Sequence, residues 1–376
     1  MLHELAKEYR IFLLFNANKV YDRQILKGIG DFLQMHHLNW NIYLSDNLCW
    51  DSNDRENLYC DGMIANCDDH LIDNLIKQHS YPIVGVGASF HCFQEFHSIP
   101  YVASDNEALV KSAFDHLCSK GLKQFALYSY PPNRLTRFAY EREIAFEKIT
   151  KQKNYPSYIY RGLTMNLDNW QTNLKNLTEW LNSLPKHVGI IAVNDAKARH
   201  ILQVSKQLNK TIPDECCLIG IDNEEVINYL SNGCLSTVTQ GTEEMGYQAA
   251  GLLHQMLEGK TVKIKQILVP PKQIIERQST DYRSIEDPLV IQAIHYIRNY
   301  ACKKIKVEHV VNSLHLSRSN LEGRFKQEFN KTIHEVIYEE KLKHAQYLLS
   351  YTKMPLAKIS EQCGYASLQY FYHLFN

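Results

Sequence analysis

The sequence has little of what marks secreted, membrane-spanning or disulfide-rich proteins. Its apolar run near the N-terminus, residues 11–15, is shorter than the apolar core of a secretory signal, and no other run approaches the length of a membrane span. The ten cysteines include no Cys-x-x-Cys pair, and Cys216 and Cys217 are neighbours in an apolar stretch. This usage is typical of buried thiols in a reducing compartment and disfavours a zinc site or a disulfide framework. We therefore expect a cytoplasmic protein with no membrane segment.

The motifs of common enzyme classes are also missing. There is no Gly-x-Ser-x-Gly elbow, no phosphate-binding loop and no His-Glu-x-x-His pair, and the 17 histidines are scattered. The stretch "GVGAS" at residues 85–89 follows an apolar run as a nucleotide-binding turn does, but it lacks the full glycine spacing and the acidic residue expected further on. The sequence favours a protein that is not an enzyme and that has no metal and no cofactor.

Length and charge indicate more than one domain. At 376 residues the chain is longer than a single hydrophobic core usually supports. Hydrophobic residues make up 45% of it, enough for a chain that folds throughout. The net charge is zero but uneven, because residues 287–376 hold 12 Lys and Arg against 8 Asp and Glu, whereas residues 1–286 hold 29 against 33. A basic end on an acidic body favours a nucleic-acid partner, although four charges do not decide it.

Up to about residue 280, short apolar runs alternate with helical periodicity. The runs predicted to be strands are residues 10–16, 62–66, 82–87, 101–105, 124–130, 189–194, 216–222, 236–240 and 265–271. Helices are predicted at residues 24–36, 106–120, 141–150, 196–208 and 242–258. Runs that are apolar on both faces and are followed by helices indicate parallel strands of a covered α/β sheet. Because nine strands exceed one typical sheet, we expect two α/β lobes, with a ligand at the carboxyl ends of the strands.

Polar side chains repeat at these predicted strand ends. A sugar presents hydroxyl groups around weakly apolar ring faces, so its site needs aromatic rings together with Asp, Asn, Gln or Arg. The candidates for a sugar site are Asn18, Tyr21, Asp22, Arg137, Arg142, Asn194, Asp195, Asp222 and Gln240. The two arginines flank the start of the helix predicted at residues 141–150, and Trp170 is assigned to a loop. Each residue alone is as well explained as a turn former or a surface group, and only their repetition indicates a site.

From residue 288 onward the sequence shows helical periodicity only. We predict a sensor body over residues 1–276, a linker over residues 277–287 and an all-helical domain over residues 288–376. Two units of this domain each combine a short helix, a tight turn and a second helix, at residues 307–329 and 356–376. Such a unit is suited to placing its second helix in a DNA major groove. One unit alone would match a plain helical hairpin equally well, whereas two are much more specific.

The second helix of each unit has a polar face. Ser317 and Ser367 are predicted N-caps. The inward positions are predicted to be Leu321 and Phe325 in the first unit and Leu368, Phe371 and Phe375 in the second. The candidates for DNA contacts are Ser317, Arg318, Ser319, Asn320, Arg324, Ser367, Gln369, Tyr370 and His373. Ser, Asn, Gln and Arg read base edges and basic groups meet phosphates, so for the two arginines a phosphate contact or a solvated charge stays an alternative to base reading.

The C-terminal stretch has a recognisable pattern. Residues 316–376 read "LSRSNLEGRFKQEFNKTIHEVIYEEKLKHAQYLLSYTKMPLAKISEQCGYASLQYFYHLFN". They resemble the AraC-family DNA-binding domain in the order of first recognition helix, linker helix, I-x-x-x-C-G-Y turn and second recognition helix. The resemblance implies binding of double-stranded operator DNA. The family usually continues with a basic stretch, a Thr-Pro or Ser-Pro pair and a Tyr-Arg pair that this sequence does not contain, so we expect the C-terminal end of the domain to be incomplete.

The body has a resemblance of its own. Residues 9–275 resemble lactose-repressor-like and periplasmic sugar-binding proteins, whose two lobes close on a sugar. This resemblance implies a type I periplasmic-binding-protein-like fold for the body. Together with the resemblance of the C-terminal stretch, it implies that this fold is followed by an all-α double helix-turn-helix domain. The sugar contacts that it implies are Tyr21, Asp22, Arg142, Asn194, Asp222 and Gln240. With segments such as "LLFNANKVYDRQ", "GIIAVNDAKARHILQV" and "CGYASLQYFY", the whole chain resembles the family of bacterial xylose-operon activators.

That resemblance implies a function. The protein is expected to be a homodimeric activator that binds D-xylose between its lobes, binds operator DNA and recruits RNA polymerase to xylose catabolic and transport genes. Two alternatives remain open at this point, a regulator that responds to another pentose and a sugar-binding protein without a DNA function. The helical tail argues against the second.

Overall fold

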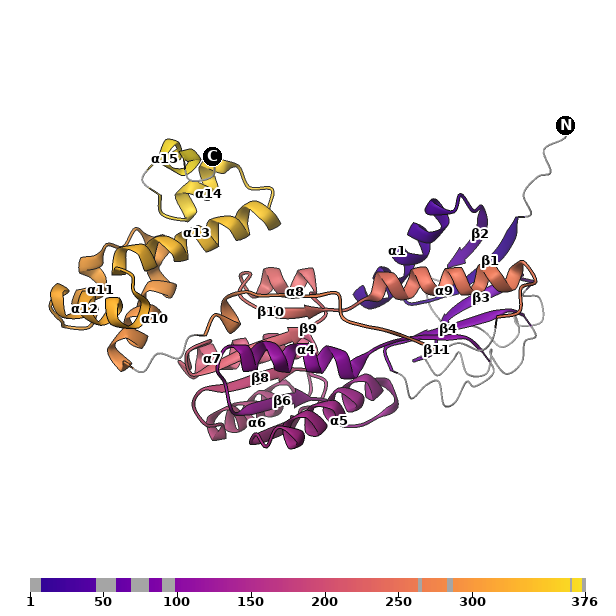
Figure 1. Cartoon of the computed structure of the whole chain (residues 1–376), viewed down its shortest axis with the longest axis horizontal. Helices are drawn as coiled ribbons and strands as arrows, with labels where there is room; N and C mark the ends of the chain where they lie inside the picture. Colours follow the sequence, from indigo (N-terminus) through magenta and orange to yellow (C-terminus); the bar gives the residue numbers. More distant parts are fainter. Residues whose placement is uncertain are drawn as a thin grey trace. The chain divides into compact units, whose positions relative to one another are not determined.

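The computed structural model describes residues 8–44, 59–68, 81–89, 99–262, 266–282, 287–365 and 367–373. The chain divides into two compact units, Met1–Tyr282 and Arg283–Asn376 (Figure 1). The first is an α/β body, and the described residues of the second form helices. The predicted fold class, an α/β body followed by an all-helical domain, is confirmed.

The body contains two six-stranded sheets among its described residues. The first sheet has the order β11-β5-β4-β3-β1-β2, and all its neighbouring strands are parallel. Its strands are β1 Tyr9–Leu14, β2 Trp40–Leu44, β3 Gly62–Asn66, β4 Ile83–Gly87, β5 Tyr101–Ser104 and β11 Gln266–Val269. β3, β4 and β5 are buried along their whole length, which explains why they are apolar on both faces.

The second sheet has the order β12-β10-β9-β8-β6-β7, with only β12 antiparallel to its neighbour. Its strands are β6 Phe125–Ser129, β7 Ser157–Arg161, β8 Val188–Ala192, β9 Cys216–Ile221, β10 Ser236–Thr239 and β12 Gln273–Ile275. All nine predicted strands are therefore present. The strands β2, β7 and β12 are additions, and each lies at an edge of its sheet.

Helices cover both sheets, and the chain passes between the lobes after β5, after β10 and after β11. The helices of the body are α1 Val20–Met35, α4 Asn106–Ser119, α5 Arg137–Gln152, α6 Trp170–Ser183, α7 Asp195–Gln207, α8 Glu225–Leu230 and α9 Thr242–Leu257. α1 and α9 lie side by side in Figure 1. Two glycines make this contact possible, because a Cβ on Gly28 would lie 1.8 Å from the Glu243 carbonyl oxygen and one on Gly246 would lie 2.0 Å from that of Ile25.

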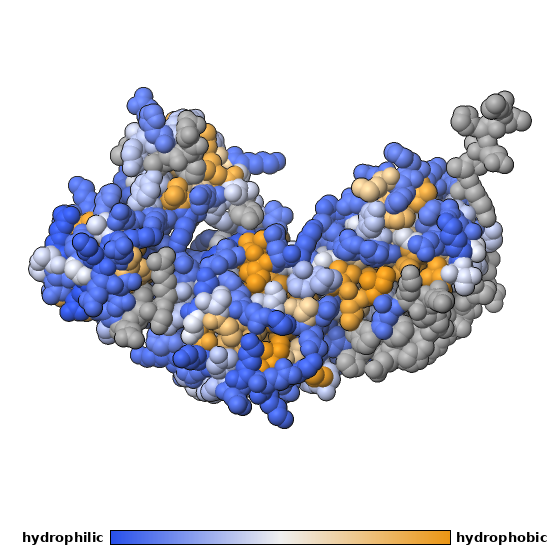
Figure 2. Space-filling model, viewed as in Figure 1, coloured by the Kyte–Doolittle hydropathy of each residue, from blue (hydrophilic) through white to orange (hydrophobic). Residues whose placement is uncertain are grey.

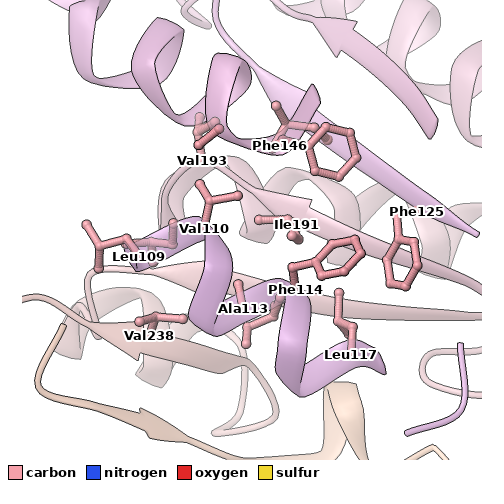
Figure 3. Close-up of a cluster of buried hydrophobic side chains, with 14 of the residues drawn as sticks. Leu109, Val110, Ala113, Phe114, Leu117, Phe125, Phe146, Ile191, Val193 and Val238 are labelled. Carbon is pink, nitrogen blue, oxygen red and sulfur yellow. The ribbon is translucent and has the colours of Figure 1, made fainter. Parts of the chain in front are cut away.

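One of the two cores of the second lobe lies between α4 and the sheet. Figure 3 shows Leu109, Val110 and Phe114 of α4 against side chains of the strands, among them Ile191 and Val238. These residues are almost fully buried. The carboxyl ends of β9 and β10, which carry Asp222 and Gln240, are thus fixed on a packed layer.

The helical unit contains α10 Pro288–Tyr300, the 3-10 turn η4 Ala301–Lys303, α11 Val307–Ser313, α12 Arg318–Phe329, α13 Ile333–Tyr351, α14 Leu356–Gln362 and α15 Leu368–His373. Its apolar side chains form two clusters, and α13 contributes Ile333, Val336 and Ile337 to one and Ala345 and Leu348 to the other. α13 thus connects two small helical cores, one with the helices α11 and α12 and the other with α14 and α15.

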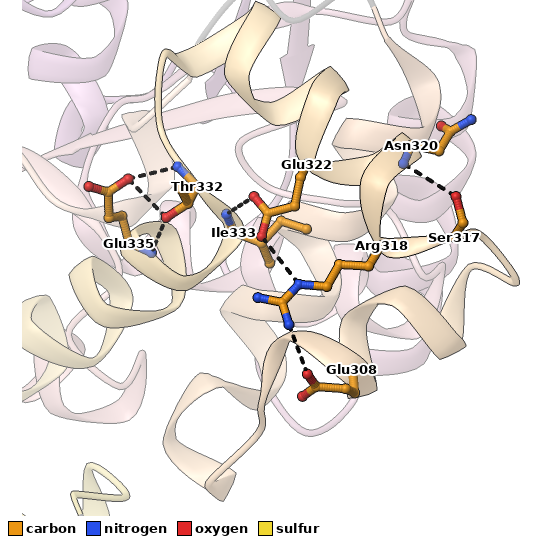
Figure 4. A network of polar contacts seen from close by, with 8 residues as sticks. All are labelled: Glu308, Ser317, Arg318, Asn320, Glu322, Thr332, Ile333 and Glu335. Carbon is orange, nitrogen blue, oxygen red and sulfur yellow. Dashed lines mark hydrogen bonds and ion pairs between the residues drawn. The ribbon is translucent and has the colours of Figure 1, made fainter.

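Local hydrogen bonds start the helices of this unit. Thr332 and Glu335 form a capping box at α13, in which the Thr332 N–H donates to Glu335 Oε2 at 2.7 Å and the Glu335 N–H donates to Thr332 Oγ1 at 3.2 Å (Figure 4). Of the predicted inward positions, Leu321, Phe325 and Phe371 are buried. Leu368 is 36% exposed, so its inward assignment is wrong; Phe375 lies outside the described residues.

The predicted linker differs from the structure at its start. Residues 278–280 form the 3-10 turn η3, in which Ser279 and Thr280 are buried against the body. Ser279 Oγ donates to the Leu218 carbonyl at 2.6 Å, and the Ser236 N–H donates to Ser279 Oγ at 2.8 Å. The body therefore extends to Tyr282 rather than ending at Glu276, because hydroxyl groups that the sequence shows as loop formers bond β9 and β10 of the second sheet.

The face of the molecule seen in Figure 2 is mostly hydrophilic, with an apolar patch over α8, where Val226 and Leu230 are exposed. Within the part of the chain that the structure describes, no helix combines the length and apolarity needed to cross a membrane.

Candidate functional site

A chain of polar side chains connects the carboxyl ends of strands from both lobes. Ser104, the last residue of β5 in the first lobe, donates from Oγ to Gln240 Oε1 at 2.9 Å. Gln240 follows β10 of the second lobe, and its Nε2 donates to Asp222 Oδ1 at 2.6 Å. On the other side, the Tyr21 hydroxyl lies 3.5 Å from Ser104 Oγ. The predicted residues Tyr21, Asp222 and Gln240 are thus brought into one network, with Ser104 as the link that sequence reasoning missed.

Asp222 has a backbone that few residues adopt. Its φ is 127° and that of Asn223 is 55°, so two successive non-glycine residues have positive φ. Such strain persists only where the surroundings enforce it, and it is concentrated at functional sites. The Asp222 N–H donates to the Val238 carbonyl at 3.0 Å, and Arg277 donates to Asn223 Oδ1 at 3.1 Å, so hydrogen bonds on both sides hold the strained turn.

Arg142 supplies the opposite charge to this carboxylate. Its side chain is 1% exposed, Nε donates to Asn106 Oδ1 at 2.9 Å, and Nη1 donates to the Val193 carbonyl. Burial lowers the pKa of Arg142, while the Asp222 carboxylate acts against that shift. Burial raises the pKa of Asp222 to about 6, and the Arg142 charge and the Gln240 amide oppose it. Each charge therefore favours the ionised form of the other in this buried site.

Asn106 orients the arginine. Its Oδ1 accepts from Arg142, and its Nδ2 donates to the Ala88 carbonyl at 2.7 Å and to Glu141 Oε2 at 2.6 Å. Asn106 begins α4 directly after β5, so the rule that selected polar residues at strand ends would have found it.

The aromatic neighbours of the site were also missed by the sequence analysis. The Arg142 guanidinium lies 5.0 Å from the centre of the Phe138 ring, and the Tyr130 hydroxyl lies 3.5 Å from Asn194 Nδ2.

Three predicted sugar contacts have partners within their own lobe. Asp22 accepts from the Asn16 N–H at 2.7 Å and from Asn66 Nδ2 at 2.9 Å. Asp195 accepts from Thr237 Oγ1 at 2.8 Å and from the Glu224 N–H at 2.9 Å, and it thereby anchors the turn that carries Asp222. Burial and the nearby Asp222 raise the pKa of Asp195. Asn194 caps α7, accepting from the Lys197 N–H at 2.9 Å.

The candidates still to be placed are Asn18 and Arg137. Asn18 is exposed before α1. Arg137 and Arg142 do not flank a helix start, because α5 begins at Arg137 and contains both. Trp170 is not in a loop but begins α6, where its ring packs edge-on at 6.2 Å from that of His200. The helix was misjudged because "DNWQTNL" is polar along its exposed face.

The helical unit presents two short helices whose outer faces are polar. Ser317 caps α12 by accepting from the Asn320 N–H at 3.3 Å, and the Tyr370 N–H lies 3.2 Å from Ser367 Oγ before α15. The predicted DNA-contacting residues that are exposed are Ser317, Arg318, Ser319, Asn320, Ser367, Gln369, Tyr370 and His373. Both second helices thus carry donors and acceptors on their outer faces.

The two arginines of α12 differ. Arg318 is 61% exposed and lies 3.2 Å from Glu308 and 3.9 Å from Glu322 (Figure 4). Such exposed pairs are weak enough to exchange for a phosphate. Arg324 instead pairs with Asp287, the N-cap of α10, and donates from Nε to Asn320 Oδ1 at 2.7 Å. The structure therefore assigns Arg324 a contact inside the helical unit that sequence reasoning did not anticipate.

Comparisons with known proteins cover both units. Family models match at residues 10–107, described as XylR N-terminal domain, at residues 114–280, described as periplasmic binding protein-like domain, and at residues 310–376, described as helix-turn-helix domain. The chain is 48% identical over 370 residues to the xylose operon regulatory protein of Escherichia coli K12, covering 98% of this chain and 94% of the relative. It is also 48% identical over 367 residues to that of Haemophilus influenzae Rd, covering 98% and 95%.

A solved structure agrees with these relatives. The structure of the xylose-binding transcription activator xylR is 49% identical in sequence, covers 98% of this chain and 95% of its own, and superposes with a TM-score of 0.87. These relatives are transcription regulators and not enzymes. The chain therefore belongs to the family of xylose operon regulatory proteins, with a periplasmic-binding-protein-like body and a C-terminal helix-turn-helix domain.

Proposed function

We propose that this protein binds D-xylose at the polar network between its lobes and, as a homodimer in the cytoplasm, activates genes of xylose uptake and catabolism. The observation that carries the proposal is the hydrogen-bonded path from Tyr21 and Ser104 in the first lobe to Gln240 and Asp222 in the second. The identity of the sugar is inferred from the names of the similar regulators, and the side chains that would bind it are inferred from the network.

The chemistry of the network suits a neutral polyol. Asp222 and Gln240 offer acceptor and amide groups at one edge, Arg142 offers a fixed donor, and the Tyr21, Tyr130 and Phe138 rings offer faces for the apolar side of a sugar ring. These groups interact electrostatically. The charge of Arg142 acts to lower the pKa of Tyr21, and the charge of Asp222 acts to raise the pKa of Tyr130. A sugar with hydroxyl groups at matching positions would take the place of hydrogen bonds between the lobes, such as the one from Ser104 to Gln240.

Sugar binding would act through lobe closure. The lobes share three chain crossings, and a ligand shifts their equilibrium only if it binds the closed state more tightly than the open one. D-Xylose meets that condition, because its contacts with both lobes form together only on closure. In the proposed dimer, closure changes the relative placement of the two subunits and so that of their DNA-binding units.

The DNA-binding half of the proposal uses both helix-turn-helix pairs. Successive major grooves on one face of a duplex lie about 34 Å apart, so two recognition helices joined by a rigid helix can read neighbouring grooves. We assign α12 and α15 to the grooves and α13 to the connection. RNA polymerase is the proposed partner at the promoter.

Fluorescence anisotropy tests the coupling of sugar to DNA. The probe is labelled duplex from upstream of the xylose genes of the same genome, titrated with protein at one salt concentration with and without D-xylose. We expect tighter binding with D-xylose, and no change with D-glucose. Equal affinity for the promoter with and without D-xylose would contradict the coupling; a response to L-arabinose or D-ribose alone would instead favour a regulator of another pentose.

A further inference from the structure

Two cysteines and a histidine of the helical unit, far apart in sequence, meet beside the second helix-turn-helix pair. Cys302 belongs to η4, His344 to α13, and Cys363 follows α14. The two sulfur atoms and a ring nitrogen all lie within 4.8 Å of one another. Cys363 is fully buried, and Cys302 and His344 are partly buried. The site is therefore lined by protein and still accessible.

The backbone holds the three elements tightly together. A Cβ on Gly364 would lie 2.6 Å from the Cys302 carbonyl oxygen, so the turn of the second helix-turn-helix pair rests directly on η4. Lys341 Nζ donates to the Gly364 carbonyl at 3.1 Å and ties α13 to the same turn. The donor atoms are thus set by packing between elements rather than by one flexible loop.

Two thiols and an imidazole form a donor set for thiophilic d10 cations. Zn–S distances of about 2.3 Å and Zn–N distances of about 2.0–2.1 Å place neighbouring donors of a tetrahedral site roughly 3.5–3.8 Å apart. Cu⁺ prefers the same soft donors. Donors already within 4.8 Å reach such spacing by small side-chain rotations.

A buried hydroxyl next to the cysteines lacks a partner. Tyr365 is 6% exposed, and among the described residues its hydroxyl makes no hydrogen bond. It belongs to the same buried cluster as Cys363, and Cys302 packs against that cluster. An unpaired buried hydroxyl is unfavourable, whereas a metal-bound thiolate is an acceptor that it can donate to.

We propose that Cys302, His344 and Cys363 bind one thiophilic d10 cation, Zn²⁺ or Cu⁺, with water or a small thiol as a further ligand. The bound ion fastens the turn between α14 and α15 to η4 and α13, and thereby fixes the second recognition helix. This inference does not depend on the identity of the sugar. The sequence alone disfavours a metal site because the three ligands are not clustered in it.

Metal titration of the reduced full-length protein tests the proposal. Zn²⁺ is titrated against a chromogenic chelator, and Cu⁺ against a Cu⁺-selective chelator, in separate arms. We expect one equivalent of at least one ion to bind, and Cys302→Ser to weaken binding by at least about a hundredfold, more than the roughly 10- to 100-fold typical of losing an outer partner of a ligand. Cys118→Ser, at a partly buried cysteine in the body, is the matched control and should bind as the parent protein does.

Co²⁺ provides a second readout that does not depend on affinity. Cobalt–thiolate charge-transfer absorption should appear in the parent protein, weaken in Cys302→Ser and persist in His344→Gln with altered visible bands, because both sulfurs remain in that variant. Circular dichroism checks that the variants are folded. Binding of neither ion by the reduced parent protein, or equal binding by the parent and Cys302→Ser, would overturn the proposal. A Cys302–Cys363 disulfide that forms in the presence of Zn²⁺ would also overturn it.

Discussion

Asp222 is the residue whose removal most sharply tests the proposed sugar site. It occupies a strained turn, its Oδ1 accepts from Gln240 at 2.6 Å, and its charge is balanced by the buried Arg142. Asp222→Ala removes both acceptor oxygens, whereas Asp222→Asn keeps the size and one acceptor oxygen, loses the charge and replaces the other oxygen by an amide donor. The two variants therefore separate the loss of the whole polar group from the loss of its charge and one acceptor oxygen.

The expected loss of sugar-binding free energy follows from the hydrogen-bonding groups that Asp222→Ala leaves unpaired. A hydrogen bond to a charged group contributes about 1.5–3 kcal/mol, and a buried partner left without one is penalised further. With alanine, sugar hydroxyls and the Gln240 amide lose their acceptor, so we expect a loss of about 2 to 4 kcal/mol in sugar binding. At 1.4 kcal/mol per factor of ten, Kd rises about 30- to 700-fold. With asparagine the charge and one acceptor oxygen are lost while the other oxygen remains, and we expect Kd to rise about tenfold.

Isothermal titration calorimetry with D-xylose measures both variants. The matched control is Asp214→Asn, a buried aspartate that precedes β9 at the end opposite Asp222. It is expected to affect folding stability but to leave Kd unchanged. Sugar affinity that is the same in Asp222→Ala and in the parent protein would refute the assignment of Asp222 to the site.

Three further predictions concern pH, packing and DNA. Because burial raises the pKa of Asp222 from 3.8 to about 6, the folded state binds more protons than the unfolded state between these pH values. The stability of the parent protein relative to Asp222→Asn should therefore fall as pH rises from 4 to 6 and then level off. Urea unfolding at a series of pH values measures this difference in stability, and a difference that does not change with pH would contradict the prediction. Gly28→Ala should lower the free energy of unfolding by about 1–3 kcal/mol or more, because its Cβ would overlap the Glu243 carbonyl. Gly30→Ala, with open space on the same helix, should be neutral or stabilising. Equal urea midpoints for the two variants would refute the packing argument. Arg318→Ala should weaken promoter binding and reduce the salt slope of log K by about 1, the loss of one phosphate contact, while an unchanged slope would remove Arg318 from the DNA face.

Arg324 has a different expected effect. Because it pairs with Asp287 at the N-cap of α10, Arg324→Ala should lower the stability of the helical unit as well as any DNA affinity. Thermal unfolding of Arg324→Ala beside Arg318→Ala distinguishes the two. A loss of promoter affinity without a loss of stability would return Arg324 to the DNA face.

The fold was largely predictable because most strands are buried on both faces. β3, β4, β6, β8 and β9 are continuous apolar runs, and such runs are visible without any partner. Two edge strands, β2 and β7, were not predicted. Both contain aromatic and aliphatic residues, but β2 has three exposed residues and β7 has none that is buried, so neither is a buried strand with apolar residues on both faces. The end of the body was misplaced for a related reason, since η3 joins it through hydroxyl groups rather than apolar side chains.

The site was predictable only in part, because position at a strand end does not reveal what a side chain bonds. Asp195 and Asp222 both follow strands, yet Asp195 is satisfied inside its lobe and Asp222 lies in the network between lobes. Ser104 and Gln240 are 136 residues apart, and no local pattern indicates their hydrogen bond. The same holds for Cys302, His344 and Cys363, which only the packing of η4, α13 and α14 brings together.

Calorimetric titration of the full-length protein with D-xylose, L-arabinose, D-ribose and D-glucose tests the central claim most directly. Binding of D-xylose in the micromolar to millimolar range, with no heat from the other three sugars, is the predicted result. No heat from any sugar, or binding of another pentose in preference to D-xylose, would contradict the assignment of the network between the lobes as a D-xylose site.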